Sequence, residues 1–511
     1  MTAGPAAAAG VPWPSSEHYA SRARRQAIIL AATTLVVALA YALAIIATDG
    51  EFLLVVPLVA VFVAIAIIAH PPAGIYLVFG GALLFEQFAI SGLAPPTAQS
   101  HIFENISEYT PVPIKLSVVD LLMLLTFASW LVRGVALGRE PLRAGPFGKA
   151  VAAYTTVFVV GVAIGVSRGG GWDPNAALNE LRAPAELCLV YFLATNLIRD
   201  RAQLFVLLAE FVGLVGVKAL QGISNYLGAQ SLGLSLEAVT SHEDVVFFDV
   251  AIALMVVVAL LGLRTKLTYA LMALVPVILT AEVLTQRRVG FIALATVVLA
   301  MLMVSATVAP RRVLVLAVVG AIAFGAYAAF FWDESGPVAE PLRAIQTVID
   351  PGAKSARDAG SDHWRDIENR NIASTIRQLP LTGVGVGQQY FFQEEPPPLP
   401  ASFPYWRYIT HNAVLWLWLK AGPLGAFALW FLVARVLLVG SSLYVRLRDP
   451  GLRLVAALPV AVVVCQIVFS SVDLGLSYTR TMLVLGTSLG LVAVLVQPKV
   501  PSRDGEMAAQ R

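Results

Sequence analysis

The sequence predicts an all-α, polytopic membrane bundle of about 12–14 transmembrane helices, with one large extracytoplasmic loop late in the chain. Of the 511 residues, 58% are hydrophobic and only 13% are charged, whereas a soluble domain has roughly 25% charged residues. Apolar runs of about 18 residues, long enough to cross a bilayer, recur along the chain. The longest polar interval, about eighty residues from Trp332 to Thr410, interrupts these runs late in the sequence.

Length and hydropathy give about fourteen candidate spans, of which one or two short ones are compatible with re-entrant segments. They lie near 27–48, 52–69, 73–90, 116–133, 149–166, 184–198, 202–220, 244–262, 267–284, 289–307, 312–331, 411–436, 452–470 and 480–497. Arginines precede the first run, as in a signal peptide, but the run is too long for one and no clear cleavage site follows. We therefore expect a retained first helix.

These spans divide the chain into five parts. We expect a disordered cytoplasmic N-terminus over 1–26, a transmembrane bundle of about eleven spans over 27–331, and a large extracytoplasmic loop with an amphipathic helix over 332–410. The C-terminal spans occupy 411–497, and a cytoplasmic tail occupies 498–511.

Lys and Arg are concentrated in the loops that follow even-numbered spans, and only the loop near 70–72 lacks them. Because basic loops stay in the cytoplasm, this pattern places both termini inside and the large loop outside the plasma membrane. A second group of arginines lies near span ends on the expected outer side, against that bias: Arg168, Arg182, Arg287, Arg288 and Arg480. They suggest an anionic ligand, because guanidinium binds phosphate through a bidentate fork. Alternatively, they snorkel or pair with Asp173, Glu180, Glu282 or Asp473.

Three smaller features complete the pattern. Ser361–Leu379 has helical spacing and ends before Pro380, and Gly383–Gly387 is expected to be a tight backbone turn rather than a nucleotide-binding loop. His242, Glu243 and Asp244 could form a metal site, but adjacent residues at a helix start point in different directions, and Asp244 could simply be a cap. Cys188 and Cys465 lie inside apolar runs, which argues against a disulfide framework and a thiol metal site.

Several short motifs occur in a characteristic order late in the chain. They are Thr285–Gly290 with Arg288, Arg365 before a helix, Pro380–Gly385, the pair His411–Asn412 at a span start, and Gly422–Gly425. This order resembles the O-antigen ligase/polymerase superfamily of bacterial envelope proteins over roughly residues 180–435. The chain departs from that family at Arg287, Val289, Asn369 and Lys420, and at His242–Asp244, where an Asn is common.

The resemblance implies a GT-C-like glycosyltransferase that moves a glycan from an undecaprenyl-diphosphate carrier to a glycan or lipid acceptor. The leaving diphosphate needs cationic stabilisation, for which Arg288 is the first candidate, supported by Arg182 and Arg287. The attacking hydroxyl needs a base, and His411 is the best candidate, because imidazole titrates near neutral pH. Arg365 is a further expected substrate-binding residue.

Asn412 could bind substrate, orient His411 or cap the helix. We expect membrane lipids around the chain, and no metal, cofactor or nucleic-acid partner.

A transporter or lipid-linked glycan flippase is the alternative function, supported by the many spans and by Lys420 inside one of them. No internal repeat is evident, however, and the polar groups gather at one face, which favours an enzyme. A scaffold protein would leave Arg288 and His411 unexplained. The sequence does not separate ligation from polymerisation, nor name the sugars or the acceptor.

Overall fold

The computed structural model describes residues 55–496, apart from Ala89, Ser91, Ala94, 137–141, Ser235, Glu237, Ser335, Pro351, Ala353, Ser355 and 398–404. The expected N-terminal segment, the first span and the C-terminal tail lie outside these residues. The chain forms two compact units, residues 1–69 and 70–511. In the first unit, the structure describes one helix, α2 (Val55–Ala69).

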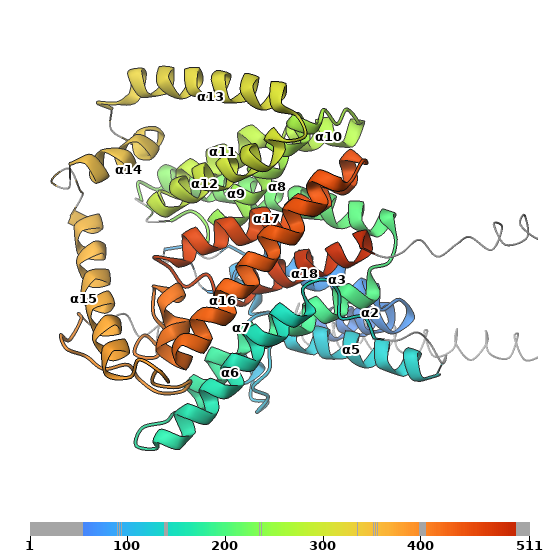
Figure 1. The fold of residues 1–511 in the computed structure, drawn as a ribbon, viewed down its shortest axis with the longest axis vertical. Helices are drawn as coiled ribbons and strands as arrows, with labels where there is room; N and C mark the ends of the chain where they lie inside the picture. The colour runs from blue at the N-terminus through green and yellow to red at the C-terminus, as the bar shows by residue number, and fades with distance from the viewer. Residues whose placement is uncertain are drawn as a thin grey trace, which may run out of the picture. The chain divides into compact units, whose positions relative to one another are not determined.

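All regular elements described in the second unit are helical (Figure 1). They are η2 (Ala98–Ser100) and η3 (Pro337–Ala339), with α3 (Pro72–Leu84), α4 (Ile106–Tyr109), α5 (Val118–Ala136), α6 (Gly148–Arg168), α7 (Pro174–Leu197), α8 (Arg201–Ser231), α9 (Asp244–Leu261), α10 (Lys266–Met272), α11 (Val275–Leu284), α12 (Arg288–Ala306), α13 (Pro310–Phe331), α14 (Glu340–Ile349), α15 (Ala356–Gln378), α16 (Ala413–Arg446), α17 (Pro450–Ser470) and α18 (Thr479–Leu495).

Eight helical stretches in the described part are long and apolar enough to cross a membrane: α6, α8, α9, α10 with α11, α12, α13, α16 and α17. Three shorter apolar helices lie in α2, α3 and α18. The predicted fold class, a polytopic helical membrane bundle, is therefore confirmed.

Helix α7 begins ten residues before the predicted span. Asp173 caps its first turn by accepting a hydrogen bond from the Asn175 N–H, and Pro174 occupies the first helical position, where it costs no hydrogen bond. Glu180 and Arg182 therefore lie on a helix rather than in the loop that their charges suggested.

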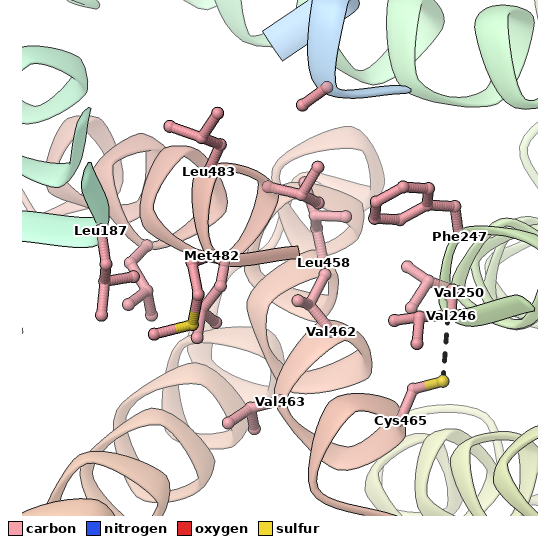
Figure 2. Packing of buried hydrophobic residues seen from close by; sticks show 14 of the residues in the cluster. Leu187, Val246, Phe247, Val250, Leu458, Val462, Val463, Cys465, Met482 and Leu483 are labelled. Carbon is pink, nitrogen blue, oxygen red and sulfur yellow. Dashed lines mark hydrogen bonds between the residues drawn. The ribbon is translucent and has the colours of Figure 1, made fainter. Parts of the chain in front are cut away.

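Helix α9 is at the centre of the bundle, because nearly all of its side chains are buried. Figure 2 shows Phe247 and Val250 of α9 facing Leu458 and Val462 of α17, with the Cys465 thiol directed to the Val246 carbonyl. Neither Cys188 nor Cys465 forms a disulfide, as predicted. By contrast, α13 buries no residue although it is apolar all round, which is typical of a helix that contacts lipid.

The polar segment, residues 332–410, contains η3, α14 and α15. The predicted helix after Ser361 is confirmed as part of α15, which ends just before Pro380 and packs against α16 at the edge of the bundle (Figure 1). Trp364, Ile367 and Ile372 are buried on one side of it.

The predicted glycine turn is confirmed and fits into a kink of α16. The helix is interrupted at Ala421 and Gly422, before Pro423. Proline has no N–H for the carbonyl four residues earlier, that of Leu419. The Val384 N–H donates to this Leu419 oxygen instead, at 2.7 Å. The two motifs are therefore complementary. The kink at Pro423 leaves the Leu419 carbonyl without its helical donor, and the glycine turn supplies the Val384 N–H as a replacement.

Candidate active site

His411 lies at the start of α16 and is held by α15. Its backbone N–H donates to both Glu368 oxygens at 3.0 and 3.2 Å, and its Nδ1 lies 3.3 Å from Glu368 Oε1. The Trp364 ring meets the imidazole edge to face, with centroids 4.9 Å apart. Because Glu368 and Trp364 are one helical turn apart on α15, a single face of that helix sets the position of His411.

A buried carboxylate, Asp473, lies between α17 and α18 beside two histidines. His242 Nδ1 is 3.5 Å from Asp473 Oδ2, and Asp473 accepts hydrogen bonds from the Tyr478 hydroxyl at 3.0 Å and the Leu474 N–H at 2.7 Å. Burial opposes ionisation of this carboxyl, but the hydrogen bond to His242, electrostatic interaction with His242 and His411, and the Leu474 N–H hold its pKa below its ordinary value.

The adjacent arginines at the α11–α12 junction point to different partners. Gln286 before them adopts a left-handed conformation, with φ 53°, and Arg287 takes the N-cap position of α12. The Arg287 guanidinium contacts His242 Nε2. The Arg288 guanidinium instead donates to Asp362 Oδ1 of α15 at 3.0 Å.

Asp362 also lies close to two further cationic side chains, those of Lys354 and Arg365. Lys354 Nζ lies 2.7 Å from its Oδ2, and Arg365 Nη1 lies 3.9 Å from its Oδ1. Asp358, one turn earlier on α15, is 3.6 Å from Arg288. Predicted residues Arg288 and Arg365 are thus brought to one carboxylate, on the same helix that holds His411.

Asn412 is a helix cap. Its side-chain oxygen accepts from the Leu415 N–H at 3.1 Å, and its side-chain amide donates to Asn369 of α15 at 3.2 Å. Arg182, in contrast, binds a different set of partners: it is 3.1 Å from Asp120 Oδ2 and donates to the Asn105 side chain.

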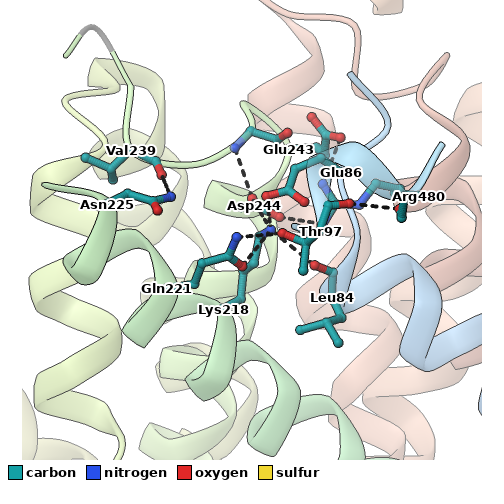
Figure 3. Close-up of polar contacts among 12 residues, drawn as sticks. Leu84, Glu86, Thr97, Lys218, Gln221, Asn225, Val239, Glu243, Asp244 and Arg480 are labelled. Atoms are coloured by element: carbon teal, nitrogen blue, oxygen red, sulfur yellow. Dashed lines mark hydrogen bonds and ion pairs between the residues drawn. The ribbon is translucent and has the colours of Figure 1, made fainter. Parts of the chain in front are cut away.

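A separate network of buried charges connects α8, α9 and α18 (Figure 3). Arg480, with 0% side-chain exposure, lies 2.8 Å from Glu243 and 2.5 Å from Asp244. Lys218 contacts Glu86 and lies 4.0 Å from Asp244. Arg480 is therefore part of an internal ion-pair network rather than an arginine at the surface. Its guanidinium is already bound by the carboxylates of Glu243 and Asp244.

The side chains of His242, Glu243 and Asp244, which were considered as metal ligands, bind other partners. Since His242 turns to Asp473 while Glu243 and Asp244 turn to Arg480, the three side chains do not converge. Within the described residues, no group of three His, Cys, Asp or Glu side chains could hold a metal ion.

Lys420 is paired inside the bundle. Its Nζ lies 2.7 Å from Glu180 Oε1 and donates to the Gln388 carbonyl at 2.7 Å. Glu180 also accepts hydrogen bonds from the Gly387 N–H at 2.6 Å and from the Trp416 indole at 3.1 Å. This pair fastens the glycine turn to α7 and α16.

Sequence analysis missed Glu368 and Asp362 as site residues, and it considered Asp473 only as a partner for an arginine. The helical spacing of Asp358, Asp362 and Arg365 could have indicated a charged face. Nothing local marks Glu368, since its role depends on the fold that brings α15 beside His411.

Together these contacts bring His411, through Glu368, and the cations Arg288, Lys354 and Arg365, through Asp362, to helix α15. The fold defines a multi-pass helical membrane protein. A family model described as O-antigen ligase matches residues 273–431, which supports the predicted resemblance to the O-antigen ligase/polymerase superfamily. No curated protein matched the chain. Arg288, Arg365 and His411 lie inside the matched region, whereas Arg182, His242 and Asp473 lie outside it.

Proposed function

We propose that the chain transfers a glycan from an undecaprenyl-diphosphate carrier to a glycan or lipid acceptor on the outer face of the plasma membrane, without a metal or other cofactor. One observation carries the proposal: α15 contacts both His411, through Glu368, and Arg288, through Asp362. A proton acceptor and an anion-binding group are thereby held by one element, as a glycosyl transfer from a diphosphate requires.

In the proposed reaction, His411 accepts the proton of the attacking acceptor hydroxyl. The acceptor oxygen bonds to the anomeric carbon of the donor as the bond from that carbon to the phosphate oxygen breaks. The diphosphate leaves with the bonding electron pair, and Arg288, Arg287 and Arg365 stabilise its charge. Arg182, bound to Asp120, is proposed as an additional donor contact, and Asn412 orients the start of α16 beside His411.

The outward location of the site and the cytoplasmic termini belong to the same proposal and depend on the distribution of Lys and Arg among the loops. Both ligation to a different acceptor and polymerisation of a repeat unit fit this chemistry. The transporter alternative rests on the many spans and on Lys420, whose charge is balanced by Glu180.

The test is a mass balance of surface glycan in a deletion strain of the source bacterium that expresses wild type, His411→Ala or Arg288→Ala. The proposal predicts that both variants insert normally yet leave glycan on its lipid carrier at the outer face. Long stranded chains would indicate a ligase, and single repeat units a polymerase. Wild-type surface glycan with both variants would refute the site, and carrier-linked glycan trapped at the inner face would instead support a flippase.

A further inference from the structure

Three cations from separate parts of the chain surround the carboxylate of Asp362. Arg288 lies at the start of α12, Lys354 in the segment before α15, and Arg365 in α15. Their side-chain nitrogens are 3.0, 2.7 and 3.9 Å, respectively, from the nearest Asp362 carboxylate oxygen. The side chains of these four residues are 20–29% exposed. A ligand from outside can therefore reach them, unlike the buried Arg480 pair.

The charges in this cluster do not balance. Among the ion pairs of the described residues, Arg288, Lys354 and Arg365 contribute three positive charges, and Asp358 and Asp362 contribute two negative charges, which leaves one net positive charge in this group. Burial favours the neutral form of Asp362, but the hydrogen bond from Lys354 and the charge of Arg288 keep its pKa below the ordinary value. The cluster thus stabilises an anion.

A phosphate group could occupy the same position. Phosphate oxygens accept hydrogen bonds from guanidinium and ammonium groups as carboxylate oxygens do, and a diphosphate brings more negative charge than one carboxylate. Without any anion, three cations at these distances would repel one another. A side-chain carboxylate that occupies the site between ligands would remove this cost.

We propose that Asp362 is an internal substitute for a diphosphate, which displaces it and binds Arg288, Lys354 and Arg365. This makes Lys354 a further ligand-binding residue. The inference deepens the proposed function and rests on it for the identity of the donor. Asp362 and Glu368 lie on one helix, α15. Displacement of Asp362 by the diphosphate would therefore couple donor binding to the position of the helix that holds His411.

The alternative is that Asp362 is a permanent tie that positions Arg288. The two possibilities predict opposite effects of Asp362→Asn on anion binding. If Asp362 competes with the ligand, removing its charge strengthens binding. If Asp362 positions Arg288, removing its charge weakens binding.

The experiment is calorimetric titration of inorganic pyrophosphate into the full-length protein in phosphatidylcholine nanodiscs. We expect Asp362→Asn to bind pyrophosphate about threefold to tenfold more tightly than wild type. Lys354→Ala should bind about tenfold more weakly, the loss expected for one charge-assisted hydrogen bond. Parallel titrations with inorganic phosphate, and with nanodiscs containing phosphatidylglycerol, separate a diphosphate site from a lipid-headgroup site: a headgroup site would lose pyrophosphate binding in the anionic nanodiscs.

The matched control is the exposed pair Arg370–Glu394, 2.8 Å apart, which also involves α15. Glu394→Gln and Arg370→Ala should leave pyrophosphate binding unchanged, and Asp362→Glu, which keeps the charge, should remain close to wild type if the fold is intact. No binding by wild type, weaker or unchanged binding by Asp362→Asn, or wild-type binding by Lys354→Ala would each overturn the inference. If binding behaves as predicted while surface glycan is independent of the chain, the anion site stands and the proposed function fails.

Discussion

Glu368 is the residue that we expect to position His411, since its buried carboxylate accepts from the backbone N–H of His411 and lies beside the ring. Glu368→Gln keeps the shape but removes the charge, and we predict a fall in transfer rate of about tenfold or more. His363→Ala is the control, because His363 is exposed on the same helix and should retain activity. Rates of glycan transfer by membranes of matched protein content measure the effect, and equal rates for Glu368→Gln and wild type would exclude the positioning role.

Asp473 makes a pH-dependent contribution to stability. Its pKa in the folded protein is lowered, so its stabilising contacts are fully present above the ordinary value of about 3.9 and are lost as the pH falls through the folded value. Asp473→Asn should reduce stability at pH 7 by about 1–3 kcal/mol and flatten the acid dependence. Thermal unfolding of both proteins in detergent from pH 2 to pH 7 tests this, and parallel curves would contradict it.

At the scale of elements, the glycine turn is the joint between the polar segment and the bundle. Gly385 has φ 96°, and a Cβ added there would overlap the backbone of Gly165 in α6. Gly385→Ala should therefore cost about 1–3 kcal/mol or more in stability. Gly360→Ala is the control, since Gly360 lies in α15 with open space around it and alanine favours helix by about 1 kcal/mol. Unfolding temperatures that fall for both variants would contradict this account of the joint.

The ion pair of Lys420 and Glu180 fastens the same joint from inside. Lys420→Met leaves Glu180 buried without its cation, and we predict a loss of about 3–5 kcal/mol. The double variant Lys420→Met/Glu180→Gln should recover part of that loss, because glutamine is neutral and its single carbonyl oxygen can still accept from one of the two donors, the Gly387 N–H or the Trp416 indole. A double-mutant cycle on thermal stability checks this, and additive losses would show that the two residues act independently.

At the scale of the whole molecule, the sequence predicts the bundle well because the bilayer imposes long apolar helices. The limits of α7 were wrong, since Glu180 and Arg182 suggest a loop until their partners Lys420 and Asp120 are known. The structure brings His411 and Arg288 to α15, which also carries Arg365, and the roles of these residues stay predictions.

The residues that surround this set could not be predicted, for a physical reason. Glu368 and Asp473 act on His411 and His242 only through contacts between elements far apart in sequence. Likewise, Pro423 indicates a kink, but only the fold reveals that Val384 binds the released carbonyl of Leu419.

The central claim is that His411 and Arg288 carry out glycan transfer from a lipid diphosphate. The most direct measurement is single-turnover transfer by the purified full-length protein in liposomes, with carrier-linked glycan extracted from the deletion strain and the strain's own acceptor. We predict that His411→Ala lowers the chemical rate by about 10²–10⁴-fold and that Arg288→Ala lowers it by about 10²–10³-fold, with both proteins folded. Transfer at the wild-type rate by either folded variant would contradict the account.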